Sequence, residues 1–254
     1  MPDCSGVEFR PRSPDSPVGN RDVTLKFHAQ RQSLVHVLLH LFIGSLLLVA
    51  GTLYADWNFS AINSITDQRY GQATPEARQR IAAWQALMQA QQTTTESQKL
   101  ESVNRFFNDR IAYREDIDVW QQEDYWATPI EMLRKGMGDC EDYAIAKYLT
   151  LVHLGVEREK LRITYVKALS LNRAHMVLSY YPSPNAIPLI LDSLITEIRP
   201  ATQRNDLLPV YSFNGDGLWL PGTGGNRRAG DSKRLSRWQD LLIKMRAEGF
   251  SLDE

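Results

Sequence analysis

The chain has 254 residues, of which 43% are hydrophobic and 23% are charged, and its formal net charge is −1. This balance is typical of a folded domain with a sizeable core, and it argues against wholesale disorder. The near-zero charge lacks the basic excess of nucleic-acid-binding proteins, so we expect no nucleic-acid partner. Two cysteines are too few for a disulfide scaffold or a four-thiolate zinc site.

The most apolar segment lies near the N-terminus, where Leu34–Leu53 reads LVHVLLHLFIGSLLLVAGTL. A spanning helix needs about 20 such residues, and a basic stretch precedes the segment, as in a secretory signal or an uncleaved anchor. A buried core helix is the alternative, but no amphipathic face is visible. We therefore expect residues 1–55 to be a cytoplasmic leader with an apolar signal or anchor. Residues 56–254 would then form one exported domain.

Helices come first in the exported part. Apolar residues at helical spacing and a Pro at the first position predict two helices within 75–110, separated by a polar break at 91–95. Residues 111–138 are rich in glycine, proline and aromatic residues, so we expect loops there. A third helix is predicted from about 140 to 154, and Gly155 ends it.

The second half changes to a period typical of β-strands. The expected elements are strands at 161–167, 176–181, 189–191, 206–213 and 217–220, a turn at 182–188, a glycine-rich loop at 222–230 and a final helix at 235–245. Helices followed by an antiparallel sheet indicate an α+β fold.

Export would leave one cysteine, Cys140, and two histidines, His153 and His175. An unpaired cysteine in an exported domain is a buried apolar residue, a site of intermolecular pairing or a reactive thiol. Gly136 and Gly138 precede Cys140 and allow a tight turn, so we expect the thiol at the first turn of a helix. There the helix dipole lowers the thiol pKa, and free backbone N–H groups can hold an oxyanion.

A nucleophilic cysteine needs a base, and helix geometry separates the two histidines. His153 lies thirteen residues along the same helix, roughly 20 Å from the thiol, and is out of reach. His175 and Asp192 flank the turn at 182–188, so antiparallel pairing would place them opposite or diagonal to each other. We interpret them as a triad with Cys140, in which the carboxylate orients the imidazole. The alternative is a buried cysteine and a satisfied core histidine.

Three carboxylates, those of Asp139, Glu141 and Asp142, flank the cysteine in sequence. They would disfavour the thiolate and raise the pKa of the thiol. Clustered carboxylate oxygens are also the ligands that Ca²⁺ prefers, and a bound ion would neutralise them and make the thiol metal-dependent. The alternative is that these are ordinary helix N-terminal acids favoured by the dipole. The spacing is not that of an EF-hand loop.

Four sequence blocks resemble one known family. They are DYWATPIEMLRKGMGDCEDYAIAKY (124–148), AHMVLSYY (174–181), LILDSL (189–194) and PVYSFNGDGLW (209–219). Together they resemble the bacterial transglutaminase-like cysteine proteinases, over roughly residues 75–245. The resemblance implies a papain-like or transglutaminase-like core with a Cys-His-Asp triad.

The same resemblance assigns the triad to Cys140, His175 and Asp192, and Ca²⁺ binding to Asp139, Glu141 and Asp142. It makes two aspartates of the preceding loop weaker candidate ligands, namely Asp116 and Asp118. The Cys140 N–H and a donor from the 120–130 loop would hold the oxyanion.

The resemblance also implies a biological role. We expect a periplasmic endopeptidase that cleaves a large surface adhesin near its N-terminus, at a paired-alanine site, and so promotes biofilm dispersal. An inner-membrane c-di-GMP receptor of the LapD type would inhibit the enzyme by sequestering it. Two alternatives stay open: acyl transfer to an amine, as in transglutaminases, and a non-catalytic calcium-dependent binding module.

Overall fold

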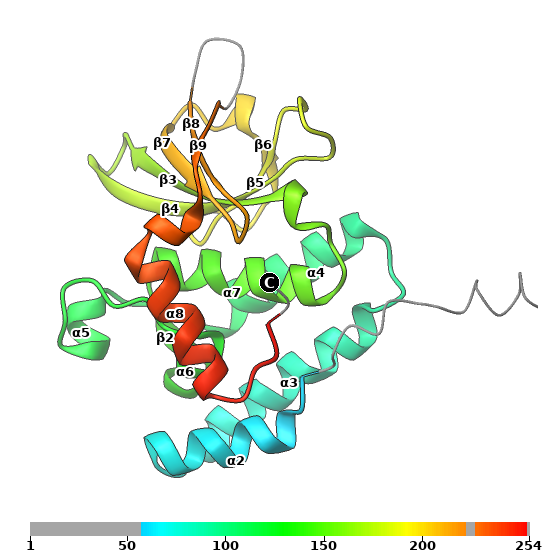
Figure 1. Ribbon diagram of the computed structural model, residues 1–254, viewed down its shortest axis with the longest axis vertical. Helices are drawn as coiled ribbons and strands as arrows, with labels where there is room; N and C mark the ends of the chain where they lie inside the picture. Colours follow the sequence, from blue (N-terminus) through cyan, green and yellow to red (C-terminus); the bar gives the residue numbers. More distant parts are fainter. Residues whose placement is uncertain (1–56, 222–226, 253–254) are drawn as a thin grey trace, which may run out of the picture. The chain divides into compact units, whose positions relative to one another are not determined.

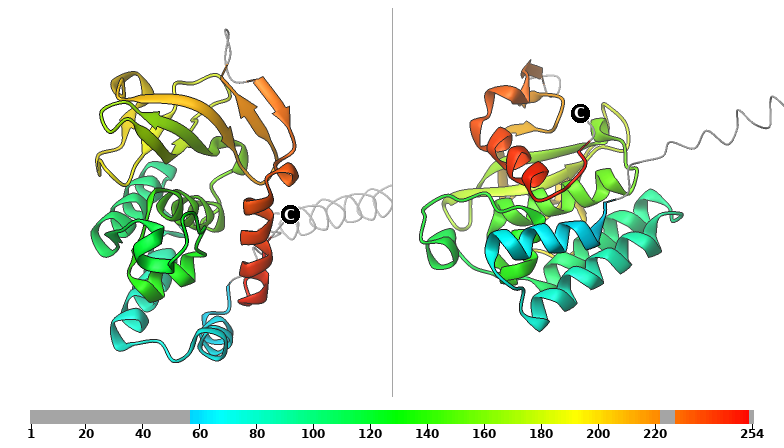
Figure 2. Two further views of the ribbon diagram at one scale, coloured as in Figure 1. Left: turned by 90° about the vertical axis from the view of Figure 1, so that its left-hand side faces the viewer. Right: turned by 60° about the horizontal axis from the view of Figure 1, so that its bottom comes forward.

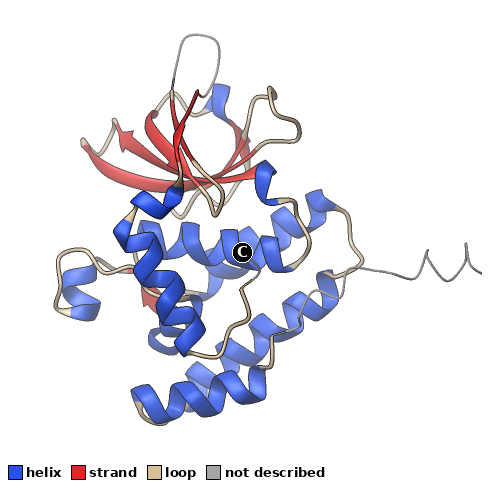
Figure 3. Cartoon of the chain, viewed as in Figure 1, coloured by secondary structure: helices blue, strands red, loops and turns tan. Residues whose placement is uncertain are grey.

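The computed structural model describes residues 57–221 and 227–252, which belong to one compact unit, Tyr54–Glu254. The predicted leader and apolar segment at 1–55 lie outside the described residues. Figure 1 shows a curved sheet as one layer above the helices, with α7 nearest to the sheet and α2 and α3 farthest from it. The views in Figure 2 show the same layering, and Figure 3 shows how helices and strands separate in space.

The helices of the described part are α2 (Phe59–Tyr70), α3 (Pro75–Gln91), α4 (Glu96–Arg110), α5 (Asp116–Trp120), α6 (Pro129–Lys135), α7 (Cys140–His153) and α8 (Ser236–Ala247). Short 3-10 turns lie at Arg158–Lys160, Ala201–Gln203 and Ser232–Arg234. The strands are β1 (Ala112–Tyr113), β2 (Met137–Gly138), β3 (Leu161–Ala168), β4 (Arg173–Tyr180), β5 (Leu189–Leu191), β6 (Arg199–Pro200), β7 (Leu207–Phe213), β8 (Leu218–Leu220) and β9 (Arg227–Gly230).

The main sheet has the strand order β6-β5-β4-β3-β7-β8-β9 among the described residues, and every neighbouring pair is antiparallel. Successive side chains of a strand point to opposite faces, so each strand contributes to both faces. Met176 and Leu178 of β4 join the helix-side core. Val177, between them, packs with Val166 and Ile190 in a smaller core on the other face.

The helix-side core holds α7 between the sheet and the other helices. The middle of α7 is buried all round, with Ile145, Leu151 and the aromatic ring of Tyr148 inaccessible or nearly so. Trp84 of α3 is fully buried and donates its indole N–H to the hydroxyl of Thr150 on α7, at 3.0 Å. A helix that is apolar around its circumference is buried on all sides, which fixes the position of its first residue.

Most of the predicted elements are confirmed. Helices α3, α4, α7 and α8 and strands β3, β4, β5, β7 and β8 lie within a few residues of the expected bounds, and the α+β class is correct. Thr74 caps α3 by accepting from the Ala77 N–H, and Thr95 forms a capping box with Gln98 at α4. These polar caps explain why the predicted break at 91–95 falls where it does.

Three expectations were wrong or incomplete. The stretch 111–138, expected to be loop, contains the helices α5 and α6, and α6 carries a capping box between Thr128 and Glu131. In the expected loop 222–230, Arg227–Gly230 forms the strand β9, which pairs with β8. The sequence of β9 has no alternation of apolar residues, so its strand conformation depends on backbone hydrogen bonds to β8. Helix α2 was not predicted, because few of its residues are apolar.

None of the described helices is both long and apolar enough to cross a membrane. The apolar segment predicted as a signal or anchor precedes the described residues.

A buried carboxylate joins the ends of three helices. Glu248, which follows α8 and is fully buried, accepts hydrogen bonds from the hydroxyls of Tyr70 at the end of α2 and Thr128 at the start of α6, both at 2.8 Å. Burial, together with the charge of Glu131, raises the pKa of Glu248 to about 7. Since the ordinary value is 4.5, between about pH 4.5 and pH 7 the folded state keeps a proton on Glu248 that the unfolded state has lost.

This pKa predicts a pH-dependent stability. A carboxyl whose pKa is raised on folding stabilises the fold below pH 4.5, and that contribution is lost as the pH rises through about 7. Glu248→Gln, which keeps an acceptor oxygen without a charge, should therefore match the wild type at pH 4.5. At pH 8 it should exceed the wild type by up to about 3 kcal/mol. Urea denaturation at both pH values measures the difference.

The matched control is Glu101→Gln, because Glu101 is an exposed carboxylate paired with Arg105. Its stability should follow the wild type at both pH values. Equal stability differences for Glu248→Gln at pH 4.5 and pH 8 would contradict the assigned protonation.

Candidate active site

Cys140 is the first residue of α7, as predicted. Asp139 precedes it as the N-cap residue, and its side chain makes no capping hydrogen bond. Gly136 ends α6 with a φ of 70°, a left-handed conformation that favours glycine. At Gly138 a Cβ atom would lie 2.7 Å from Oδ2 of Asp142, so a larger residue would push into the first turn of α7. Both glycines thus serve the turn that presents the thiol.

The expected pairing of His175 and Asp192 is confirmed as geometry. Strands β4 and β5 are antiparallel with Leu178 opposite Leu191, so Asp192, one residue beyond β5, lies diagonal to His175. Nε2 of His175 is 2.7 Å from Oδ1 of Asp192, and both side chains are fully buried. The other ring nitrogen, Nδ1, is buried and has no hydrogen-bond partner among the described residues.

Asp192 is held as an ionised carboxylate. Its Oδ2 accepts from Nη2 of Arg204 at 2.6 Å, and its Oδ1 also accepts from the Leu194 N–H at 3.0 Å. Burial would raise the pKa of this carboxyl, but the hydrogen bonds and charges of His175 and Arg204 together with the Leu194 bond lower it to about 2. An ionised Asp192 accepts a hydrogen bond from Nε2–H of His175, which favours the tautomer whose Nδ1 carries a lone pair.

The thiol lies near the start of β4, the strand that carries His175. The backbone N–H of Met176, the residue that follows His175, lies near the Cys140 thiol and lowers its pKa. The thiol itself donates to Oε2 of Glu141 at 3.0 Å. The N-terminus of α7 therefore lies near the beginning of β4, the strand that carries His175, while the thiol itself is bonded to Glu141 and not to the imidazole.

The local charges oppose ionisation of the thiol. Burial, then the charges of Glu141 and Asp139, raise the pKa of Cys140 well above its ordinary value, while the Met176 N–H lowers it. This direction was expected from the sequence, where three carboxylates flank the cysteine. Because its pKa is raised, the thiol is protonated at neutral pH, and it donates to the carboxylate of Glu141 rather than to an imidazole.

The carboxylates form a cluster that extends beyond the predicted set. Oxygen atoms of Asp116, Asp139 and Asp142 lie within 4.8 Å of one another, and a second group joins Asp116, Asp124 and Glu141. Asp116, which the resemblance implied as a weaker candidate, belongs to both groups and so bridges the three predicted residues. Asp118, the other weaker candidate, is in neither group, and Asp124 was not predicted.

A short parallel pairing explains why Asp116 joins the cluster. Strand β1 pairs with β2 through Ala112 opposite Met137 and Tyr113 opposite Gly138, so the two chain segments leave this pairing side by side. Asp116 follows β1 and the Asp139 segment follows β2. The loop before α6 completes the wall, because the N–H of Tyr125 donates to Asp116 and the N–H of Ala127 donates to Oδ1 of Asp142.

The donor set fits a hard divalent cation. Asp116 Oδ1, Asp139 Oδ1 and Asp142 Oδ2 are buried and have no hydrogen-bond partner among the described residues. Burial, followed by the nearby carboxylates, raises the pKa of Asp139 to about 10, and burial raises that of Asp116 to about 6. Buried oxygens without partners are costly, and carboxylate oxygens at this density are ligands for Ca²⁺.

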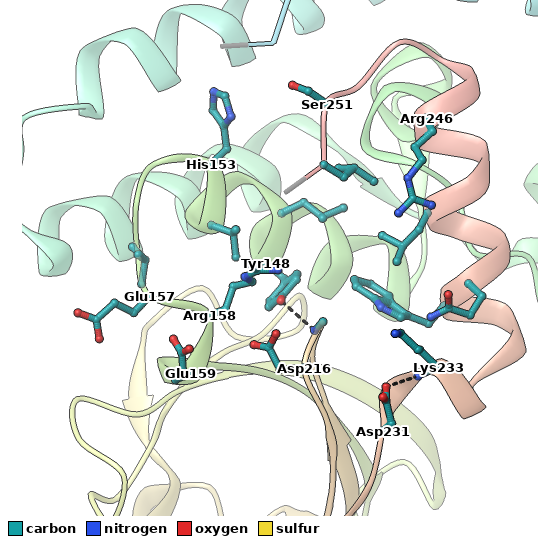
Figure 4. Close-up of a pocket in the computed structure, with 18 of the residues that line it drawn as sticks. Tyr148, His153, Glu157, Arg158, Glu159, Asp216, Asp231, Lys233, Arg246 and Ser251 are labelled. Atoms are coloured by element: carbon teal, nitrogen blue, oxygen red, sulfur yellow. Dashed lines mark hydrogen bonds between the residues drawn. The ribbon is translucent and has the colours of Figure 1, made fainter. Parts of the chain in front are cut away.

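His153 is excluded as the base, as predicted. It is the last residue of α7, and its ring stacks on Trp57 with the centroids 4.0 Å apart. There it lines a cavity of about 620 Å³ between the end of α7, α8 and the turn after β7, shown in Figure 4. None of the predicted site residues lines this cavity. Tyr148 accepts from the Gly215 N–H at its floor.

The predicted oxyanion donor in the 120–130 loop stays a prediction. Two N–H groups of this loop, those of Tyr125 and Ala127, are already bonded to carboxylates of the acidic cluster. The N–H of Cys140 lies in the first turn of α7, where backbone N–H groups have no partner within the helix.

The sequence profile of the bacterial transglutaminase-like cysteine proteinases matches residues 63–207. The chain belongs to this family. Legionella pneumophila LapG is 44% identical over 72% of this chain and 97% of LapG, with a TM-score of 0.62. EGTA-treated LapG gives 45% identity, the same coverage and a TM-score of 0.64. Calcium-bound LapG gives 44% identity over 72% of this chain and 98% of LapG, with a TM-score of 0.62.

No match was found among curated proteins. The family and these structures confirm the resemblance drawn from the four sequence blocks and the transglutaminase-like protease fold. As a member of the transglutaminase-like cysteine proteinases, the chain is a cysteine protease.

The turn before the thiol gives a stability prediction. In Gly138→Ala the new Cβ meets Asp142 Oδ2 at 2.7 Å and Asp142 Cβ at 3.0 Å, so α7 or the side chain must shift. We expect a loss of about 1–3 kcal/mol in the free energy of unfolding, measured by urea denaturation. In the control Gly215→Ala the nearest atom is 3.5 Å away, an ordinary contact. Equal stabilities of the two variants would contradict the packing described.

Proposed function

We propose that this chain is a calcium-dependent cysteine endopeptidase whose catalytic triad is Cys140, His175 and Asp192. The observation that carries the proposal is the buried His175–Asp192 pair, whose free ring nitrogen has no partner among the described residues. Cys140 lies at a helix N-terminus, near the β4 segment that carries His175, and the chain belongs to a family of cysteine proteinases. The alternative, a histidine with a purely structural role in the core, would have hydrogen-bond partners on both ring nitrogens.

We propose the following roles for these groups. Nδ1 of His175 accepts the thiol proton, and Sγ of Cys140 attacks the scissile carbonyl carbon. The oxyanion that forms is held by the N–H of Cys140 and a second donor. His175 returns the proton to the leaving amine, and a water molecule then hydrolyses the thioester with His175 again as base. Asp192 holds the imidazole in the required tautomer and stabilises its charged form.

We place Ca²⁺ on the acidic cluster, held by Asp139, Glu141 and Asp142 with Asp116 as a further ligand. Support comes from the unpartnered buried oxygens of three of these residues and from the existence of calcium-bound and EGTA-treated forms of LapG. When bound, the ion supplies positive charge next to the thiol, which favours the thiolate. Glu141, bonded to the thiol in the structure, would then serve as a ligand.

We further propose the biological setting from the family resemblance. The protease would act in the periplasm, on the N-terminal region of a large surface adhesin at a paired-alanine site, and so promote biofilm dispersal. An inner-membrane c-di-GMP receptor of the LapD type would sequester it. Residues 1–55 would direct its export, and the protein stays tethered to the membrane if this segment is not cleaved.

Removal of the thiol tests the nucleophile. Cys140→Ala should abolish cleavage of the purified N-terminal fragment of the host's large adhesin, because no other group in the triad can attack the carbonyl. Mass spectrometry of the products distinguishes hydrolysed from cross-linked fragments. Cys4→Ala is the matched control, since Cys4 is the only other cysteine of the chain, and it should cleave like the wild type. Undiminished cleavage by Cys140→Ala would refute the proposal.

Removal of the ion tests the metal. Excess EGTA should abolish cleavage, and Asp139→Ala and Glu141→Ala should lose both cleavage and calcium binding measured by isothermal titration calorimetry. Asp118→Ala is the matched control, because this nearby acid is in neither carboxylate group, and it should bind calcium like the wild type. Full cleavage in excess EGTA, or unchanged calcium binding by Asp139→Ala, would contradict this part of the proposal.

A further inference from the structure

A buried lysine lies in the middle of the helix that carries the thiol. Lys147 is seven residues after Cys140, two helical turns along the same face of α7, and its side chain is fully buried. A buried ammonium group is costly unless it is bonded, so lysine is rarely fully buried. Burial lowers the pKa of Lys147 to about 7, and the charge of Asp192 opposes that shift. The triad chemistry does not use this residue.

The contacts of Lys147 lead to Asp192. Its Nζ donates to the main-chain carbonyl oxygen of Asp192 at 3.0 Å. The same oxygen accepts from Nδ2 of Asn108 on α4 at 2.8 Å. The ammonium group also lies over the ring of Tyr143, 5.5 Å from its centroid. Two helices thus hold one carbonyl group, that of the acid paired with His175.

This carbonyl lies where the sheet no longer fixes the chain. The ladder between β4 and β5 ends at Leu191, so Asp192 follows the last paired residue of its strand. Without ladder bonds, the backbone of Asp192 would depend on its side-chain bonds for its position. Lys147 and Asn108 supply the missing backbone bonds from the helix side. Because Lys147 and Cys140 share α7, the bond sets the position of the acid relative to the nucleophile.

We propose that Lys147 is a positioning residue of the protease, which holds Asp192 in register with the helix that carries Cys140. The inference rests on the proposed triad. A positioning role and a purely structural role predict different effects of substitution on stability and on activity. Burying the ammonium group is costly, and in Lys147→Met the Asp192 carbonyl still accepts from Asn108 while its carboxylate keeps Arg204, so no polar partner is left unpaired. Lys147→Met should therefore keep or raise stability while it lowers activity.

The experiment measures kcat, KM and Tm of the full-length Lys147→Met variant with the adhesin fragment in calcium. We expect kcat to fall about 10- to 100-fold with KM unchanged, because a misplaced acid impairs the chemical step and not substrate binding. The Tm should equal or exceed that of the wild type. A kcat within twofold of the wild-type value in a folded Lys147→Met variant would overturn the proposal.

Lys99→Met is the matched control. Lys99 is also buried, and its Nζ donates to a main-chain carbonyl, that of Leu154 just beyond the far end of α7, at 2.7 Å. This variant removes the same kind of bond away from the site, so its kcat should stay within twofold of the wild type. A similar loss of kcat in Lys99→Met would show that any broken lysine–carbonyl bond disturbs α7, and it would overturn the specific role of Lys147.

Asn108→Ala provides a second route to the same carbonyl if Lys147→Met does not fold. Asn108 is half-buried, and its loss removes the other donor to Asp192. We expect a smaller fall in kcat, and in the double variant a combined effect that departs from the sum of the two, because both donors share one acceptor. An unchanged kcat in Asn108→Ala, together with an unfolded Lys147→Met, would overturn the proposal.

The rate at which iodoacetamide alkylates Cys140 in calcium, measured in the Cys4→Ala background, separates the two proposals. It requires the thiol and its base but no adhesin. If the wild type fails to cleave the fragment, the proposed substrate is wrong, while a slower alkylation of Lys147→Met than of Lys99→Met still supports the positioning role. Equal alkylation rates of the two variants would count against it whatever the substrate.

Discussion

A thiol packed against buried carboxylates is the constraint on which the rest of this structure depends. Cys140 opens α7 between Asp139 and Glu141, and β1 adds Asp116 to the same cluster. Carboxylates this close cannot all be ionised without a counter-charge, and the positive end of one helix offsets only part of their repulsion. The unpartnered oxygens and the raised pKa of Asp139 express this deficit of positive charge. A calcium ion, as we propose, would supply it.

The two halves of the proposed triad differ in how complete they are. Asp192 has a cation, a ring nitrogen and a backbone N–H on its carboxylate, which lower its pKa to about 2. Its carbonyl is held from two helices. The acid and the base are therefore ordered by the protein alone. The thiol is the opposite case, because burial and Glu141 favour its protonated form. Dependence on a metal would thus be a property of the nucleophile and not of the whole site.

Much of this site follows from local sequence. The glycines before Cys140 predict a tight turn into a helix, and a strand-turn-strand pattern predicts that His175 meets Asp192. Asp116 and Asp124 belong to a stretch without periodicity, and Asp116 reaches the cluster through a parallel pairing two residues long. Such a pairing leaves no pattern in sequence. Helix α6 did leave one, the capping box at Thr128, which the expectation of loop overlooked. Lys147 gave no signal, because a lysine within a helix is ordinarily exposed.

Our central proposal is that the acidic cluster keeps the Cys140 thiol protonated and unreactive until a cation binds. The most direct test is the second-order rate of Cys140 alkylation by iodoacetamide at pH 7, in the Cys4→Ala background, with calcium and with EGTA. Each unit by which the cation lowers the thiol pKa raises the thiolate fraction about tenfold, so we predict an increase of about tenfold or more in calcium. An alkylation rate that is the same or slower in calcium would contradict the account.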